Sequence, residues 1–183
     1  MNLNSDVKEL LESFNAFQVK YLVVGGYAYA FHVEPPYTKD LDVWVRADTE
    51  NAALVYQALK AFGAPLDGLT PQDFAVEHYF YRMGSEPNAI DVMMSVSGLT
   101  FDAAWNDRVE FDYHGVTVQI IAKADLITAK LAAGRPQDLV DAHKLKETLK
   151  WKHLPKLPIN PQKPRKKSTK RSRRPRPSQT RSR

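Results

Sequence analysis

Two stretches decide the fold: YLVVGGYAYAFH, residues 21–32, and DLDVWVR, residues 40–46. The first begins as a short apolar run and stops at Gly25 and Gly26, a pattern typical of a buried strand that ends in a tight turn. A short helix is predicted to follow at residues 27–32. In the second stretch the aliphatic residues recur at every other position, which is the period of a strand. The pair predicts a strand, a glycine turn and a helix, followed by a second strand.

The rest of the first 150 residues predicts more helices and strands in mixed order. Apolar residues at helical spacing, with capping residues at their ends, predict helices at 6–17, 49–62, 124–133 and 136–150. Strands are expected at 78–83, 89–96, 109–113 and 116–121, with a helical turn at 101–106. This order predicts an α/β (α+β) fold: a small mixed β-sheet with helices packed on one side, plus a C-terminal helix pair.

Charge divides the chain into two parts. Residues 1–150 hold 13 Lys and Arg and all 21 Asp and Glu, a net charge of −8, whereas residues 151–183 hold 13 Lys and Arg and no acid. The second part has six prolines and few apolar residues, so it cannot bury enough surface to fold. We expect one folded domain at 1–150 and a basic, proline-rich, disordered tail at 151–183.

Composition excludes several classes of protein. The chain has no cysteine, which rules out disulfides, thiolate metal sites and cysteine nucleophiles and fits a reducing compartment. It has no run of about 18 apolar residues that could cross a membrane. Residues 1–12 carry acids and lack the layout of a secretory signal. We expect a cytoplasmic protein that does not contact a membrane.

Three aspartates are the candidate catalytic residues. Asp40 and Asp42 are two apart on a predicted strand, so their carboxylates share one face and repel each other unless a cation lies between them. Asp91 belongs to a second predicted strand; if that strand lies beside the first, the three carboxylates form a cluster. Such a cluster suits Mg²⁺, with one ion polarising an attacking hydroxyl and another stabilising a leaving pyrophosphate. Each acid alone also fits an ordinary strand residue.

The glycine pair adds a phosphate-binding element to these acids. Gly25 and Gly26 let the backbone approach a phosphate closely, and the helix that follows offers unpaired N–H groups. A lone glycine pair is weak evidence. A glycine pair, an Asp-x-Asp about 14 residues later and a third aspartate on another strand are stronger together.

These motifs resemble a known family. LVVGGYA (22–28), His32 and YTKDLDVWV (37–45) resemble the core of the DNA polymerase beta-like nucleotidyltransferase superfamily. Within it, the chain is similar to minimal nucleotidyltransferases of the abortive-infection toxin type, and DLITAKLAAGRPQDLVD (125–141) resembles their later helix pair. The resemblance spans roughly residues 20–145. Pro36 departs from it, because these toxins often carry an arginine at that position, whose contact would be lost unless Lys39 or Arg46 replaced it.

The resemblance implies further nucleotide-binding residues. Lys130 would contact the triphosphate, and Asp138 or Asp141 would supply an acid near the site. A Lys can serve phosphates as a mobile point charge, but Lys130 also fits a solvated helix position. Both acids also fit the first turn of a helix, where they would favour its dipole. Arg135 could cap the preceding helix or pair with either acid.

Two other segments bear on nucleic-acid binding. The run HYFY, residues 78–81, alternates, which favours core packing with one exposed face over a base-stacking platform. The segment Lys163–Arg183 carries 11 Lys and Arg in 21 residues, which predicts salt-dependent contact with RNA phosphates. The tail could instead serve solubility or fold back on the acidic domain.

The sequence thus predicts an Mg²⁺-dependent enzyme that moves a nucleoside monophosphate from an NTP to a hydroxyl and releases pyrophosphate. RNA, such as a tRNA 3′ end, is the expected acceptor, in a toxin role with a possible antitoxin protein as partner. A protein hydroxyl or a small molecule such as an aminoglycoside remains open as the acceptor. The rival function is a catalytically inactive nucleic-acid-binding module with the same fold.

Overall fold

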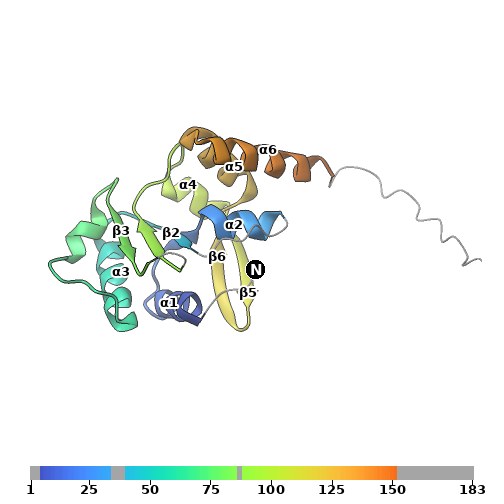
Figure 1. The fold of residues 1–183 in the computed structure, drawn as a ribbon. Helices are drawn as coiled ribbons and strands as arrows, with labels where there is room; N and C mark the ends of the chain where they lie inside the picture. Colours follow the sequence, from blue (N-terminus) through green and yellow to red (C-terminus); the bar gives the residue numbers. More distant parts are fainter. Residues whose placement is uncertain (1–4, 34–39, 86–87, 152–183) are drawn as a thin grey trace, which may run out of the picture. The chain divides into compact units, whose positions relative to one another are not determined.

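The structure is a computed structural model that describes residues 5–33, 40–85 and 88–151, with side chains up to Thr148. Its helices are α1 (Ser5–Ala16), α2 (Gly25–His32), α3 (Thr49–Phe62), α4 (Phe101–Asn106), α5 (Lys123–Ala133) and α6 (Pro136–Trp151), with a 3-10 helix η1 (Pro71–Ala75). Its strands are β1 (Tyr21–Val23), β2 (Leu41–Val45), β3 (Phe80–Met83), β4 (Ile90–Met93), β5 (Val109–Tyr113) and β6 (Val116–Ile120). Figure 1 shows their arrangement.

Within the described residues the strands form one six-stranded sheet in the order β3-β4-β2-β1-β6-β5. The sheet is mixed, because β2 runs parallel to β4 and β1 parallel to β6, while β1 and β2 are antiparallel. The predicted fold class, a small mixed α/β sheet with helices and a C-terminal helix pair, is therefore confirmed. The predicted packing of the helices on one side is wrong, because α1 and α2 lie on opposite faces of the sheet. The parallel pairing of β2 with β4 matters most, since each strand carries one of the predicted catalytic acids.

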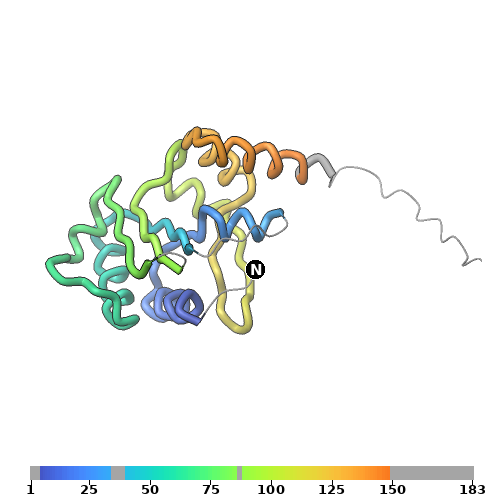
Figure 2. Tube along the Cα trace, in the orientation of Figure 1, coloured from blue at the N-terminus to red at the C-terminus, as the bar shows by residue number. Residues whose placement is uncertain are grey.

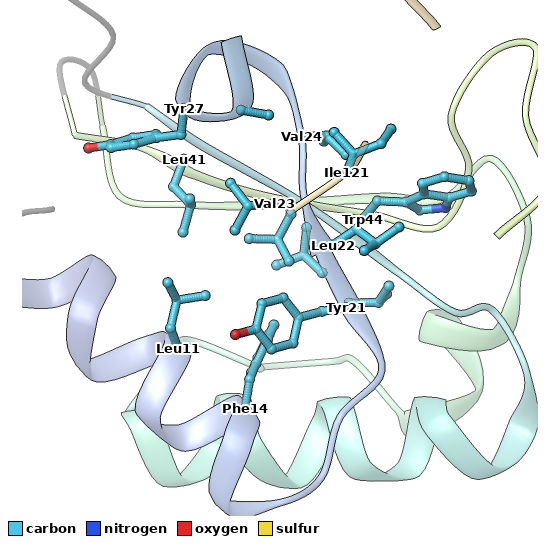
Figure 3. Close-up of a cluster of buried hydrophobic side chains, with 14 of the residues drawn as sticks. Leu11, Phe14, Tyr21, Leu22, Val23, Val24, Tyr27, Leu41, Trp44 and Ile121 are labelled. Atoms are coloured by element: carbon cyan, nitrogen blue, oxygen red, sulfur yellow. The ribbon is translucent and has the colours of Figure 1, made fainter. Parts of the chain in front are cut away.

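Helices cover the two faces of the sheet. Figure 3 shows Leu11 and Phe14 of α1 on one side of the central strands and Tyr27 of α2 on the other. On the first side the rings of Phe14 and Tyr21 lie 5.4 Å apart, edge to face, and α3 packs beside α1. On the second side α2 contacts the α5–α6 pair, and Figure 2 shows these two helices folded back against each other. The second face is the one that Asp42 reaches.

One predicted boundary is wrong in an informative way. The glycine pair does not precede the helix as a separate turn: it forms the first residues of α2, which begins at Gly25. Gly25 has a φ of +56°, in the left-handed region that favours glycine. Strand β4 also ends at Met93, three residues earlier than predicted, and the chain from there to α4 forms a loop along the candidate site.

Some predictions lie outside the described residues. These are the tail, including Lys163–Arg183, and both Pro36 and Lys39 before β2. The domain boundary near residue 150 and the cytoplasmic location stay predictions. None of the helices in the described ranges is both long and apolar enough to span a membrane.

Candidate functional site

Asp42 and Asp91 lie side by side. They are partners in the parallel register of β2 and β4, and partners on neighbouring strands project from the same face of a sheet. Asp91 is buried, with 5% of its surface exposed, and Asp42 is half-buried. The sequence prediction that acids far apart in the chain meet on one face is thus confirmed for this pair.

The start of α2 is in direct contact with Asp42. The backbone N–H of Gly26 donates to Asp42 Oδ2 at 3.4 Å, and the N–H of Val24 donates to the backbone oxygen of Asp42 at 3.0 Å. A Cβ on Gly25 would lie 1.9 Å from Asp42 Oδ2, so no other residue fits there unless the carboxylate moves. The sequence predicted a close approach at this glycine; the structure shows that the approaching group is the aspartate itself.

Asp42 carries a poorly compensated negative charge. Burial raises its pKa above the ordinary value, the Gly26 N–H lowers it, and the charges of Asp91 and Asp40 raise it again. Arg135 lowers the pKa by its positive charge, but the net direction is upward. A divalent cation would supply the missing positive charge, and carboxylate oxygens are ligands that Mg²⁺ prefers. The residues present therefore fit a metal ion next to Asp42 and Asp91.

Asp91 is held by an arginine that the sequence analysis did not single out. Arg82 Nε lies 2.6 Å from Asp91 Oδ1, and Arg82 Nη2 lies 2.7 Å from Asp91 Oδ2. Arg82 is the partner of Asp91 in the antiparallel register of β3 and β4, so Arg82, Asp91 and Asp42 form one row across three strands. Such a two-point contact fixes the orientation of the carboxylate.

Asp40 is close to the pair but has a structural contact. It lies just before β2 and accepts a hydrogen bond from the backbone N–H of Ala89 at 3.0 Å, which ties the start of β2 to the start of β4. In the part of the chain that the structure describes, no three His, Cys, Asp or Glu side chains are arranged to hold a metal ion. The three aspartates thus influence one another electrostatically without forming a ready three-ligand site, because Arg82 and Ala89 take up Asp91 and Asp40.

A cavity of about 200 Å³ opens beside Asp42. Gly25 and Asp42 line one wall, and the α5–α6 pair lines the other with Lys130, Arg135 and Asp138. The cavity is thus lined by four of the predicted site residues, Gly25, Asp42, Lys130 and Asp138, and by Arg135. The charged residues on its walls carry both signs, as a triphosphate with its counter-ions requires.

Lys130 lies inside an ionic network. Its Nζ is 3.1 Å from Asp138 Oδ1 and 2.8 Å from Asp141 Oδ2, and it sits 5.7 Å from the centre of the Tyr29 ring. Only 8% of Lys130 is exposed, so the solvated-helix interpretation is wrong. Lys130, Asp138 and Asp141 are therefore adjacent and contact one another. The triphosphate contact that the resemblance implies for Lys130 stays a prediction.

Arg135 completes this network from outside. Its Nε donates to Asp138 Oδ2, which confirms the pairing alternative, while 78% of the Arg135 side chain remains exposed. Burial by itself would raise the pKa of Asp138, but hydrogen bonds from Arg135 and Lys130 outweigh it, so the pKa is lowered. Arg135 also lies close enough to Asp42 to lower its pKa. It is the exposed cation shared by both acids.

A second, larger cavity of about 590 Å³ shares the loop Ser95–Ser97 with the first. Trp44 and Phe101 line it, with ring centroids 5.1 Å apart. Trp44 is 2% exposed, so it packs into the core on the Asp42 face.

His32 has a structural contact, because its Nε2 lies 2.8 Å from the backbone oxygen of Ile121.

Comparisons with solved structures find several matches at low sequence identity. The chain matches the solution structure of the antibiotic-resistance factor ANT(2'')-Ia with 12% identity and a TM-score of 0.50, over 80% of this chain and 86% of that one. It matches the lincomycin-bound lincosamide antibiotic adenylyltransferase LnuA with 16% identity and a TM-score of 0.47, over 81% and 99%. An antigenic nucleotidyltransferase-like protein from Paracoccidioides brasiliensis matches with 15% identity and a TM-score of 0.48, over 81% and 78%. At such identities the likeness concerns the fold alone.

The sequence itself identifies the family. A comparison with curated proteins gave no match. Residues 1–175 match the profile of a family described as nucleotidyltransferase of unknown function (DUF6036). That match covers nearly the whole chain, and it agrees with the paired aspartates beside a glycine-led helix. The protein belongs to this nucleotidyltransferase family.

Proposed function

We propose that this protein transfers a nucleoside monophosphate from an NTP to a hydroxyl acceptor at Asp42 and Asp91, with Mg²⁺ as cofactor. The observation that carries the proposal is the contact between the Asp42 carboxylate and the Gly25–Gly26 start of α2, in register with Asp91. In the reaction the acceptor oxygen bonds to the α-phosphorus, and the bond from that phosphorus to the bridging oxygen breaks. Pyrophosphate leaves, and the hydroxyl proton passes to Asp91.

The triphosphate would bind in the cavity between α2 and the α5–α6 pair. The N–H groups at the start of α2, with the positive end of its dipole, suit the phosphate oxygens. Arg135 is exposed and near Asp42, so its guanidinium could turn to a phosphate without leaving a buried charge unpaired. Lys130 would add positive charge at the cavity wall, and Asp138 and Asp141 would hold its side chain in place.

Asp42 and Asp91, with Asp40 nearby, would hold the Mg²⁺. When bound, the ion would neutralise the negative charge that builds up on the phosphates and the acceptor oxygen. The raised pKa of Asp42, caused by burial and by repulsion from Asp91 and Asp40, supports a cation at this point. Arg82 holds the Asp91 carboxylate at two points, which fixes its orientation beside Asp42.

RNA is the proposed acceptor, with a tRNA 3′ end as the first candidate. The support comes from the sequence: Lys163–Arg183 carries 11 Lys and Arg in 21 residues, enough for strong electrostatic attraction to a phosphate backbone. The acidic domain alone, at a net charge of −8, would repel RNA. A toxin role in the cytoplasm, restrained by an antitoxin protein, follows from the resemblance to the abortive-infection type and belongs to the same proposal.

The test is a labelling experiment. Purified full-length protein is incubated with each NTP labelled at the α-phosphate, total RNA and Mg²⁺, with and without EDTA. We expect label on RNA from the parent protein, a loss of at least about 100-fold in Asp42→Asn, and no loss in the control Asp67→Asn, whose side chain is exposed in a remote turn. Absence of label on RNA, on protein and on the enzyme itself would contradict the proposal.

The alternative function is an inactive nucleic-acid-binding module. One observation favours it: both oxygens of Asp91 are engaged by Arg82, so its ability to bind a metal or a proton is reduced. The departure at Pro36 points the same way. Retention of RNA by the parent and by Asp42→Asn alike, without transfer of label by either, would establish this alternative.

A further inference from the structure

Strand β3 presents two side chains beside Asp91 that the proposed reaction does not yet use. It is the last strand on its side of the sheet, paired with β4. Phe80 is in register with Met93, and Arg82 with Asp91. Phe80 and Arg82 therefore share the face that carries the candidate active site, while Tyr81 and Met83 are buried on the opposite face.

Phe80 is unusually exposed for its size. It shows 48% of its surface, whereas the neighbouring aromatic Tyr81 shows 7% and donates from its hydroxyl to the backbone oxygen of Pro65 at 2.8 Å. An exposed apolar residue on an edge strand invites aggregation, and proteins usually avoid it. Phe80 is two residues from Arg82, which contacts Asp91, so this exposed ring lies near the candidate site. The alternation of residues 78–81 predicts one exposed face here, and the structure places that face beside the strand that carries Asp91.

Phe80 and Arg82 act as a pair. The Arg82 guanidinium carbon lies 5.8 Å from the centre of the Phe80 ring. An aromatic face next to an arginine is the combination that binds single-stranded nucleic acid, because the ring stacks on a base and the guanidinium contacts a phosphate. Arg82 contacts Asp91 through Nε and Nη2, and 46% of its side chain is exposed, so a phosphate can approach the guanidinium from solvent.

Distance links this pair to the reaction. Side chains two residues apart on a strand are separated by roughly 6.6 Å, which is about the size of one nucleoside. A base stacked on Phe80 would therefore bring its own ribose hydroxyls near Arg82 and Asp91. The platform is open at the edge of the sheet, which suits the end of a long flexible chain.

We propose that Phe80 and Arg82 bind the terminal nucleotide of a single-stranded RNA acceptor, with its base on Phe80 and its phosphate at Arg82. This inference rests on the proposed function and adds the acceptor site to it. The basic segment Lys163–Arg183 attracts RNA without fixing its position. Phe80 fixes the position of the terminal nucleotide, so that one of its hydroxyls lies beside Asp91. Because an aromatic face accepts any base, the site recognises a single-stranded end rather than a sequence.

The first experiment measures binding alone. A fluorescent single-stranded RNA oligonucleotide is titrated with full-length parent, Phe80→Ala, Phe80→Tyr and Val76→Ala, at several salt concentrations. Val76 is the matched control, since it is 55% exposed and close to β3 in the chain. We expect Phe80→Ala to weaken binding at least about fivefold, the lower end for one stacked base, with the same salt slope as the parent, because the tail's phosphate contacts set that slope. Phe80→Tyr should retain the affinity. Equal affinity of Phe80→Ala and parent, or an equal loss in Val76→Ala, would overturn the site.

The second experiment separates the site from the function. In the labelling reaction with RNA, Phe80→Ala should raise the KM for RNA more than it lowers kcat, whereas Arg82→Lys should lower kcat as well, because Asp91 loses its two-point contact. If the parent transfers label but Phe80→Ala keeps the parent KM, the acceptor site is wrong and the function stands. If the parent transfers nothing but Phe80→Ala still weakens RNA binding, the function is wrong and the binding site stands.

Discussion

Asp42 and Asp138 line the same cavity, yet their pKa values are shifted in opposite directions. Burial acts to raise both. Asp138 receives hydrogen bonds from Lys130 and Arg135, which outweigh burial and lower its pKa. Asp42 receives one N–H from Gly26 and faces the like charge of Asp91, so its pKa is raised. Asp138 thus receives hydrogen bonds from two cations, whereas Arg135 acts on Asp42 only through its charge.

The difference separates an acid that stabilises the fold from an acid that serves the substrate. A carboxylate that is buried and left without a cation costs stability, and such groups concentrate at functional sites. Asp42 has this character, next to the helix start that suits phosphates. Asp138 holds the helix pair that closes the cavity. The predictions below test this contrast.

The largest effect is expected on the Asp138 side. In Lys130→Met, Asp138 and Asp141 lose the ammonium between them, and breaking a buried ion pair costs about 3–5 kcal/mol. Thermal or urea unfolding should show this loss directly. The triple variant Lys130→Met, Asp138→Asn, Asp141→Asn removes the stranded charges and should recover most of it. A single variant as stable as the parent would show that the network does not hold the fold.

Gly25→Ala should show the second largest effect. A Cβ there would lie 1.9 Å from Asp42 Oδ2, and the residue must also keep a φ of +56°. We expect transfer to fall at least about 100-fold and stability to fall by about 1–3 kcal/mol. Gly63→Ala is the control, because its φ is +89° but no atom lies within 4 Å of the added Cβ. It should lose some stability through backbone strain and keep its activity; equal activity loss in both variants would refute the contact argument.

Asp42→Asn should stabilise the protein without divalent ions while it abolishes transfer. Because its pKa is raised in the folded state, the folded protein binds this proton more tightly than the unfolded chain does. The ionised carboxylate therefore destabilises the fold as the pH rises through the folded pKa. The gain in Tm of Asp42→Asn should be present at neutral pH and vanish at acid pH, where Asp42 is protonated in both states. A variant less stable than the parent at neutral pH would contradict the assigned direction.

Asp138 should change the pH dependence of stability in the opposite direction to Asp42. Its lowered pKa means that its stabilising contribution is present above the unfolded pKa and is lost as the pH falls through the folded value. Acid should therefore weaken the parent more than Asp138→Asn. Parallel melting curves for the two proteins across acid pH would refute this.

Arg135→Gln should have the smallest effect on stability. Its side chain is 78% exposed, and Lys130 still pairs with Asp138 in the variant, so the loss should be smaller than that of Lys130→Met. Its proximity to Asp42 predicts instead a weaker affinity for NTP, measured by calorimetry with a non-hydrolysable analogue. Arg108→Gln is a control, since Arg108 pairs with Glu110 on β5, away from the cavity. Equal nucleotide affinity in both variants would remove Arg135 from the site.

Strand periodicity made the central part of the site predictable. Aliphatic residues at 41, 43 and 45 fix which face Asp42 occupies, and the apolar neighbours of Asp91 mark a second buried strand. Because side chains alternate with a period of two, the face of each acid follows from its position in the strand. The glycine pair then indicated where a backbone comes close. The order of the strands, which makes Asp42 and Asp91 neighbours, needed the structure.

The contacts of the charged residues were not predictable in the same way. The pairing of Arg82 with Asp91 depends on the register of β3 against β4, and a slip of one residue would turn Arg82 to the other face. Lys130 and Asp138 are eight residues apart on different helices, beyond the spacing at which residues on one helix meet. Their contact depends on how α5 and α6 pack. Sequence patterns located the acids, and tertiary packing decided which acids receive a cation.

The most direct test of the account is a crystal structure with Mn²⁺ and a non-hydrolysable NTP, in which anomalous scattering locates the metal. The account predicts an ion bound by Asp42 and Asp91, with phosphate oxygens at the N–H groups that begin α2. An ion or triphosphate bound elsewhere, with Asp42 untouched, would contradict it.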